Sequence, residues 1–495
     1  MPRRWIFALR YFFSYRTELI WGLVALGAGN LLLVAAPLAV MKAVAVIEGD
    51  ATAALPINYG AVAAWAALSF VLTLAAGVAA FHKRNLLMRV SRRAETDLRR
   101  DLFRHVQRLP RPFFDRVRTG DLMSRATSDV EAVRMAVGPG GMYLADALSR
   151  SAAALVAMLL ISPALTLYAL VPLAGIAAGL FVLAPRLHRT SRLVQDQQAG
   201  ISARAQESFA GARVVKTFAT EDREAEDMER LGREYLASNL RLARLRGVTD
   251  GYLTLMIALG LGLILYEGGT LYGRGRIDIG GILAFQAYQG MLLWPMMAFG
   301  WVLSLLQRGA ASLDRLQEVF RVAREAGSDG GAPRLRGEIE FRDLSFSYGG
   351  KRVLHGVSLE IRAGQTVGIT GPTGSGKSTL VSLLPRLYDP PRGALFVDGR
   401  DVHDLPLATL RGAIGFVPQE AFLFSASIRE NVAFARDAGS DGAVEAAARD
   451  AHLTGDLEGL PGGLETVVGE RGITLSGGQK QRAALARALA ADAPI

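Results

Sequence analysis

The sequence predicts a chain of two parts, an all-α domain that crosses a membrane several times and an α/β domain built around a glycine-rich loop. Three observations indicate this. The 495 residues have a positive mean hydropathy of +0.24, yet 21% of them are charged. The long apolar runs all lie within residues 19–306, and the loop GPTGSGKST follows at Gly371–Thr379. Such segregation of apolar from charged residues indicates a membrane domain joined to a soluble one.

Six apolar runs are long enough to cross a membrane, since about 20 helical residues span about 30 Å of hydrocarbon. The first is too long for a cleavable signal peptide, and no small-residue cleavage site follows it cleanly. Asp146 and Arg150 interrupt the third, and their spacing of four residues favours a mutual ion pair over a substrate site. The runs are Leu19–Met41, Tyr59–Phe81, Met142–Ile161, Leu165–Pro185, Tyr252–Tyr272 and Ile279–Leu306.

Positive charge predicts the orientation of these spans. Arg10 and Arg16 are among four arginines before the first span, and the stretches 82–141 and 186–251 are crowded with arginine, whereas the opposite loops hold few cations. Because Lys and Arg collect on the cytoplasmic side, both termini are predicted to be cytoplasmic. Topology then accounts for the net charge of +10, and no nucleic-acid partner is expected. The absence of cysteine excludes disulfide scaffolds and thiolate metal sites.

The two long cytoplasmic stretches contain few helix breakers. They are predicted to extend the neighbouring spans as helical hairpins, with tips near Arg118–Asp129 and Gly211–Glu221. Solvated charged helices without a partner are the alternative. Apolar residues at the tips favour docking; these are Leu122, Met123, Val214, Val215 and Phe218.

A soluble module follows the last span. Ala326–Pro333 (AGSDGGAP) has the composition of a flexible linker. Alternating and β-branched segments predict strands at Glu338–Tyr348, Val353–Ile361 and Thr366–Thr370, with a helix from Lys377. The domain boundaries are therefore placed at 1–325 for the membrane domain, 326–337 for the linker and 338–495 for the α/β domain.

The strand, the glycine-rich loop and the helix occur in the order that a phosphate-binding loop requires, which argues against a chance match. The glycines let backbone N–H groups turn toward nucleotide phosphates, and the helix N-terminus adds its dipole. Lys377 is expected to place a charge on the phosphates, and Ser378 to offer its hydroxyl to Mg²⁺. The predicted binding residues of this loop are Gly371, Thr373, Gly374, Ser375, Gly376, Lys377, Ser378 and Thr379.

A second motif, LSGGQ at Leu475–Gln479, precedes a helix with an apolar stripe and a basic face. Alone, it would be interpreted as an ordinary capped helix start. Paired with the phosphate loop, it predicts a second group of backbone donors for an anion.

These motifs, the Gln in IGFVPQEAFLF and the six-span half together resemble an ATP-binding-cassette exporter half-transporter. The loop sequences FFDRVRTGDLMSRATSDVEAVR and ESFAGARVVKTFATEDRE are similar to those of multidrug-resistance-like bacterial members. The resemblance covers essentially the whole chain. It implies an ABC-type ATPase and translocase of the bacterial inner (plasma) membrane, with ATP and Mg²⁺ as cofactors and a dimer of half-transporters, identical or different.

The resemblance also implies roles for single residues. Tyr348 corresponds to the aromatic that stacks on adenine; Gln419 corresponds to the glutamine that reaches Mg²⁺ and the attacking water, so it is the predicted catalytic residue beside Lys377. The segment Glu465–Gly472 is similar to one that touches the cytoplasmic loops. Four residues are expected to complete the nucleotide site of the partner subunit: Ser476, Gly477, Gly478 and Gln479.

The chain departs from the family pattern at Ile495, where it ends after the signature helix. In the family, a strand ending in a Mg²⁺-binding Asp follows, then a catalytic Glu and a His. We therefore expect nucleotide binding with poor hydrolysis, from either a fragment of a longer transporter or a hydrolysis-deficient partner subunit.

The sequence says little about the cargo. The family suggests a hydrophobic or amphipathic substrate, drug or lipid. Glu267 is a candidate substrate contact within the membrane, although its place toward the outer end of its span favours snorkelling or interfacial solvation. Tyr288, Trp294 and Trp301 would line an apolar cavity or simply pack.

Overall fold

The structure is a computed structural model that describes residues 2–53, 55–325, 334–435, 441–469 and 475–495. The chain divides into two compact units, one of Met1–Phe103 with Met123–Val319 and one of Arg104–Leu122 with Phe320–Ile495. The predicted linker at Ala326–Pro333 lies outside the described residues.

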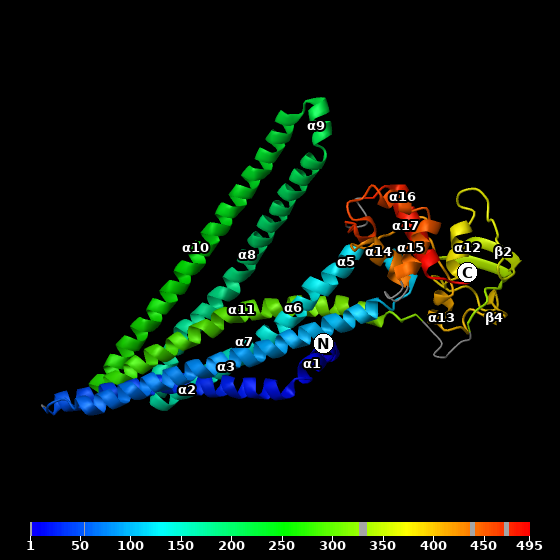
Figure 1. The fold of residues 1–495 in the computed structure, drawn as a ribbon. Coiled ribbons are helices and arrows are strands. Elements are labelled where there is room, and N and C mark those ends of the chain that lie inside the picture. Colours follow the sequence, from blue (N-terminus) through cyan, green and yellow to red (C-terminus); the bar gives the residue numbers. More distant parts are fainter. Residues whose placement is uncertain (1, 54, 326–333, 436–440, 470–474) are drawn as a thin grey trace. The chain divides into compact units, whose positions relative to one another are not determined.

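Six helices of the first unit are long and apolar enough to cross a membrane, which confirms the predicted number of spans (Figure 1). The longest has 53 residues, about 80 Å at 1.5 Å per residue, so it reaches well beyond the hydrocarbon. A shorter helix, α1 (Pro2–Phe13), precedes them. The long elements are α2 (Arg16–Thr52), α3 (Tyr59–Val106), the helical run Thr119–Ile161, α8 (Pro163–Ala210), α10 (Glu221–Gly273) and α11 (Ile279–Arg321).

The third span contains two π-helical turns. Its run consists of α5 (Thr119–Ser124), η1 (Arg125–Asp129), α6 (Val130–Met135), η2 (Ala136–Gly140) and α7 (Gly141–Ile161). On α7, Asp146 pairs with Arg150 at 3.0 Å, which confirms the predicted ion pair. The structure adds two donors to the same carboxylate, Lys83 Nζ at 2.7 Å and Asn30 Nδ2 at 3.2 Å. The pair is therefore part of a buried polar cluster shared by α2, α3 and α7.

The second predicted hairpin tip is confirmed. The helices α8 and α10 lie side by side, and the short α9 (Ala212–Phe218) connects their ends, with Ala219 in the left-handed region at φ 50° (Figure 1). The first tip was predicted too late in the chain. The turn lies around α4 (Arg111–Arg116), whereas residues 119–129 are continuous helix. Pro110 and Pro112 explain the difference, because proline interrupts the helix and restricts the residue before it.

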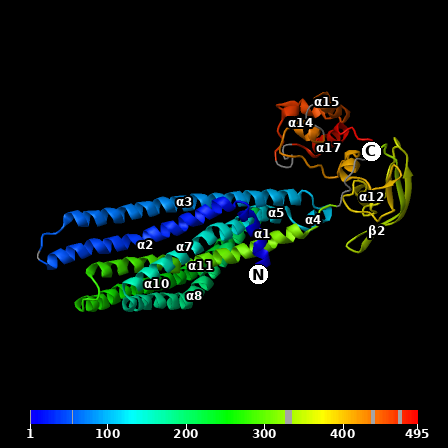
Figure 2. The same cartoon turned by 90° about the horizontal axis from the view of Figure 1, so that it is seen from below.

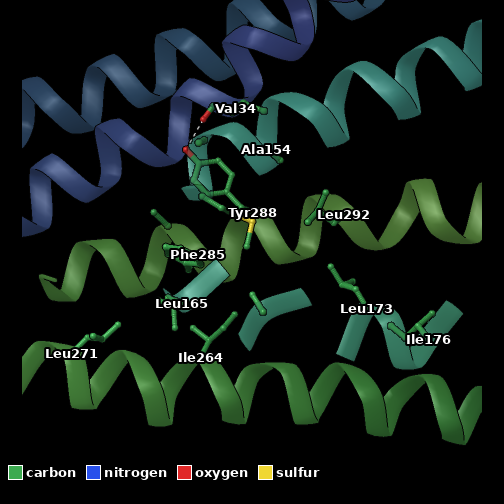
Figure 3. Close-up of a cluster of buried hydrophobic side chains, with 14 residues drawn as sticks. Val34, Ala154, Leu165, Leu173, Ile176, Ile264, Leu271, Phe285, Tyr288 and Leu292 are labelled. Atoms are coloured by element: carbon green, nitrogen blue, oxygen red, sulfur yellow. Dashed lines mark hydrogen bonds between the residues drawn. The ribbon is translucent and has the colours of Figure 1, made fainter. Parts of the chain in front are cut away.

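Side chains from five helices form the main core of the first unit (Figure 3). At its centre Tyr288 is fully buried, and its hydroxyl donates a 2.8 Å hydrogen bond to the backbone oxygen of Val34. Tyr288 is thus a packing residue, whereas Trp294 and Trp301 are 42% and 43% exposed and contact Tyr143. Glu267 lies half-buried on α10. Figure 2 shows α2 and α3 running side by side.

The second unit contains a four-stranded antiparallel sheet in the order β2-β1-β3-β4. Gly349 and Gly350 have φ of 55° and 91°, as the tight β1–β2 hairpin turn requires. Leu344, Leu383 and Leu395 are fully buried in the core against this sheet. The strands are β1 (Ile339–Tyr348), β2 (Lys351–Ile361), β3 (Leu395–Val397) and β4 (Arg400–Asp401).

The third predicted strand, Thr366–Thr370, is not a strand in the structure. Four of its five residues are exposed and the segment joins no hydrogen-bonded ladder among the described residues, so the prediction of a strand is wrong here. A strand requires a neighbouring chain for its backbone groups. Nearby, Ile495 N donates to Ala413 O at 3.1 Å, and Gly415 N donates to Ile495 O at 2.8 Å.

Short helices complete the second unit. Three of them, α14, α15 and α17, lie together (Figure 2), and they contribute Val432, Ala447 and Ala483 to a separate core. The helical elements are α12 (Lys377–Leu383), α13 (Leu407–Gly412), α14 (Ile428–Val432), η3 (Ala433–Ala435), α15 (Asp441–Asp450), α16 (Thr454–Leu457), η4 (Gly463–Glu465) and α17 (Gly477–Ala490).

The segment Arg104–Leu122 belongs to this second unit through specific contacts. Glu325 N donates to Arg108 O at 2.9 Å, and the Glu325 carboxylate receives two hydrogen bonds from Arg411, at 2.7 and 2.9 Å. This bidentate pair holds the chain after α11 against α13, and through Arg108 it also holds the start of the α4 segment.

Candidate nucleotide-binding site

The glycine-rich loop has the backbone that its sequence predicts. Gly371, Gly374 and Gly376 have φ of 153°, 85° and 89°, a region that favours glycine. A Cβ on Gly376 would lie 2.7 Å from Cδ2 of Leu354, so only glycine fits between the loop and β2. The chain enters α12 directly after Gly376, and Leu380 N donates to Gly376 O at 2.9 Å as the helix begins.

Lys377 lies across the loop. Its ammonium group donates to the backbone oxygens of Gly371 and Pro372, both at 2.8 Å. These carbonyls hold the cation over the loop, where a nucleotide phosphate would offer it oxygens with a full negative charge. Such charge-assisted hydrogen bonds are shorter and stronger than neutral ones.

A pocket of about 550 Å³ opens beside the loop. It brings Lys377, Ser378 and Gln419 together, although Gln419 is 41 residues further along the chain than Ser378. Gln419 itself is exposed. The other lining residues are Arg111, Ile369, Val381, Ser382, Leu387, Tyr388, Phe416, Val417 and Pro418.

Tyr348, at the end of β1, lies close to this pocket without being among its lining residues. Its ring meets that of Tyr388, which does line the pocket, with centroids 4.9 Å apart and planes at 84°. Phe346 completes the aromatic group at 5.0 Å from Tyr348. Edge-to-face contacts of this kind stabilise aromatic pairs.

Tyr388 also joins the aromatic group to α4. Its hydroxyl donates to Oδ2 of Asp115 at 2.6 Å, and Arg111 Nε donates to Oδ1 of the same carboxylate at 3.1 Å. Burial, and then the hydrogen bond to Asp115, raise the pKa of Tyr388 to about 12. The phenol therefore stays protonated and remains a donor at neutral pH.

The signature residues lie elsewhere in the unit. Ser476 caps α17: its Oγ accepts from Gln479 N at 3.3 Å, and Gln479 Oε1 accepts from Ser476 N at 2.8 Å. Ser476, Gly477 and Gly478 are exposed, and none of the four predicted signature residues is among the residues that line the pocket. Of the segment Glu465–Gly472, residues 470–472 lie outside the described part of the chain.

Three residues of this region were not predicted from the sequence: Arg111, Asp115 and Tyr388. No motif marks Arg111 or Tyr388, and Asp115 lies within the segment FFDRVRTGDLMSRATSDVEAVR without any role being predicted for it. The available signal was the predicted docking of the first hairpin tip, which was placed about two helical turns too late in the chain.

The residues present fit a nucleotide with its metal ion. The glycine loop leaves backbone N–H groups open, and Lys377 supplies the cation. The Ser378 hydroxyl and the Gln419 amide are oxygen ligands of the kind Mg²⁺ accepts alongside phosphates and water. In the described part of the chain no group of three or more His, Asp or Glu side chains offers a rival metal site.

Fold and site define the class: a six-span membrane domain fused to a P-loop nucleotide-binding domain. Residues 19–296 match the ABC transporter transmembrane region and residues 354–495 match the ABC transporter domain. The chain belongs to the ABC transporter family, as an exporter-type fusion of both domains.

Relatives and a solved structure agree with this assignment. The multidrug resistance-like ATP-binding protein MdlA of Escherichia coli is 35% identical over 95% of this chain and 80% of its own length. The ATP-dependent lipid A-core flippase of Desulfotalea psychrophila is 32% identical over 83% of this chain and 72% of its own. A bacterial Atm1-family ABC exporter with ATP bound superposes with a TM-score of 0.73 at 26% identity, covering 97% of this chain and 84% of that one.

Proposed function

We propose that this chain is one half of a dimeric exporter that uses ATP to move a hydrophobic or amphipathic compound, drug or lipid, across the bacterial inner membrane. The observation that carries the proposal is the convergence of Lys377, Ser378 and Gln419 on one pocket in a chain that also contains six spans. The proposed domains are residues 1–325 and 338–495, with both termini in the cytoplasm.

ATP would bind with its phosphates in the loop Gly371–Thr379 and its adenine near Tyr348. Ser378 and Gln419 would hold Mg²⁺, which supplies charge neutralisation at the phosphates. Lys377 would release the carbonyls of Gly371 and Pro372 to reach the phosphates, because an anionic acceptor binds an ammonium group more strongly than a neutral carbonyl does.

A dimer is supported by the position of the signature. The Ser476 and Gln479 side chains each accept from the other residue's backbone N–H, while Gly477 and Gly478 are exposed and do not line the chain's own pocket. An exposed group of backbone donors that its own chain does not use suits the nucleotide of a second subunit.

The cargo class is supported by the relatives' names, which speak of multidrug resistance and of lipid A-core flipping. Both describe amphipathic molecules that partition into a membrane.

A second candidate is an ATP-binding subunit that does not hydrolyse ATP itself but lends its signature to a competent partner. One observation favours it: the exposed Gly477 and Gly478 of the signature do not line the chain's own pocket, so their backbone donors are available to a partner.

The test is ATP turnover by the purified full chain in proteoliposomes, with and without Mg²⁺, beside uptake of a fluorescent amphiphile into inverted vesicles. Mg²⁺-dependent turnover coupled to uptake, both lost in Lys377→Ala, would support the exporter. Nucleotide binding without turnover would favour the second candidate. Absence of nucleotide binding would contradict both.

A further inference from the structure

We propose that the first unit holds an anionic phospholipid of the cytoplasmic leaflet, with one acyl chain in an apolar pocket between α1, α2, α3 and the η2–α7 segment. The proposal is independent of the nucleotide chemistry and rests only on the proposed cytoplasmic position of the N-terminus.

The pocket has a volume of about 160 Å³, several times the roughly 30 Å³ that a water molecule occupies in the liquid. Every residue that lines it is apolar or glycine, so water would find no hydrogen-bond partners there. Phe13 is 59% exposed, which shows that the pocket reaches the surface. The lining residues are Leu9, Phe12, Phe13, Leu19, Leu23, Leu87, Val90, Val137, Gly138, Gly141 and Met142.

Two glycines, which have no side chain, leave part of this space open. Gly138 and Gly141 line the pocket within and just after the π-helical turn η2. A Cβ on Gly138 would lie 2.2 Å from Oγ of Ser91, so this position is held to glycine by close helix contact. A Cβ on Gly141 would meet nothing within 4 Å, so the space beside it is empty.

The pocket is preformed, because α1 and the turn that follows it are hydrogen-bonded to α3. The hydroxyl of Tyr15 donates to Asp97 at 2.7 Å and that of Tyr11 donates to Asp101 at 3.2 Å. Burial, and then Asp101, raise the pKa of Tyr11 to about 12, so this donor persists at neutral pH. Phe12 packs between the two helices.

Charge at the pocket edge selects the headgroup. Arg10 and Arg16 are exposed, and neither forms an ion pair within the described residues. Arg16 precedes Leu19 and Leu23 by three and seven residues, so it lies on the face of α2 that lines the pocket. The neighbouring carboxylate, Glu18, is already paired with Arg93 at 2.8 Å.

Basic residues beside an apolar surface bind anionic lipids, each Lys or Arg near the membrane contributing about fivefold in affinity. Exposed apolar side chains on two of the helices that form the pocket, Ile6 of α1 at 61% and Trp21 of α2 at 62%, suit contact with acyl chains. An anionic phospholipid satisfies the arginines and the pocket at once.

The experiment is native mass spectrometry of the full chain in a non-ionic detergent, titrated with phosphatidylglycerol or with phosphatidylcholine of the same acyl chains. We expect tighter binding of phosphatidylglycerol. Arg16→Gln should reduce its affinity about fivefold and leave phosphatidylcholine unchanged. Gly141→Leu should fill the pocket and weaken both lipids, whereas Gly262→Leu, at an open position on α10, should weaken neither.

Equal binding of the two lipids, or undiminished binding to Gly141→Leu, would overturn the proposal. ATP binding by the second unit and the thermal unfolding temperature serve as folding controls. If Gly141→Leu unfolds, the smaller Gly141→Val takes its place under the same criteria.

Discussion

The hydroxyl of Tyr388 donates a 2.6 Å hydrogen bond to Asp115, although the two residues are 273 positions apart in the chain. The ring of Tyr388 also packs against that of Tyr348, the proposed adenine-stacking residue, with the ring centroids 4.9 Å apart. A continuous path of contacts therefore leads from the proposed nucleotide site to α4, a segment between two of the six candidate membrane spans. This path makes Tyr388 a positioning residue rather than a member of the chemical site.

We expect Tyr388→Phe and Asp115→Asn each to weaken the stimulation of ATP turnover by transported substrate. Substrate stimulation of turnover should fall by about tenfold or less. A hydrogen bond to a charged group contributes at least about 1.5 kcal/mol when it is shielded from water, and Asp115 is exposed, so this value is the upper bound here. ATP affinity should change by less than about twofold, because the ring contact with Tyr348 remains.

A double-mutant cycle provides the control for that pair. If the two residues act through their hydrogen bond, the double variant should lose no more stimulation than either single variant. Additive losses would show that each acts separately.

Tyr388 should also titrate late. Its pKa of about 12 in the folded protein lies above the value of about 10 in an unfolded chain. The contribution of protonated Tyr388 to the free energy of unfolding is therefore fully present below about pH 10, and it is lost as the pH rises toward 12. Burial is the larger cause, so Asp115→Asn should lower this pKa without restoring the ordinary value. Ultraviolet titration of the wild type minus that of Tyr388→Phe measures it; a midpoint near 10 would contradict the burial.

Lys377→Ala should weaken ATP binding by at least about tenfold, because a charge-assisted hydrogen bond contributes about 1.5–3 kcal/mol. Binding of a fluorescent ATP analogue to the purified protein measures the loss. Lys351→Ala, on the exposed start of β2 in the same unit, is the matched control and should bind normally. Equal affinities of the two variants for the ATP analogue would show that Lys377 does not bind the nucleotide.

Leu395→Ala should destabilise the second unit by about 2–5 kcal/mol, since this β3 side chain is fully buried in the core. Leu485→Ala, at a position 40% exposed on α17, should cost much less. The temperature at which the protein loses ATP-analogue binding reports the difference. Comparable losses for both variants would show that the sheet core does not limit stability.

The membrane spans and the phosphate loop were predictable because their signals are local. A run of about 20 apolar residues forms a span wherever it lies in the chain. The glycines of Gly371–Thr379 likewise dictate the loop conformation through their own backbone freedom. The ion pair of Asp146 with Arg150 follows from a four-residue spacing on one helix.

The misplaced features depend on partners far away in sequence. Thr366–Thr370 has the composition of a strand, but a strand exists only with a neighbouring chain that accepts its hydrogen bonds. The first hairpin tip was placed near Arg118–Asp129, in a stretch with few helix breakers, whereas Pro110 and Pro112 set the actual turn.

By itself, then, the sequence determined the six spans, the helical extensions, the glycine loop and the capped signature helix, all of which arise from residues within a few turns of one another. Tertiary structure alone decided that Gln419 meets Ser378 in one pocket, that Tyr388 joins Asp115, and that Lys83 and Asn30 share the carboxylate of Asp146. The physical reason is that such contacts depend on how separate elements pack, and packing sums many weak interactions over the whole domain.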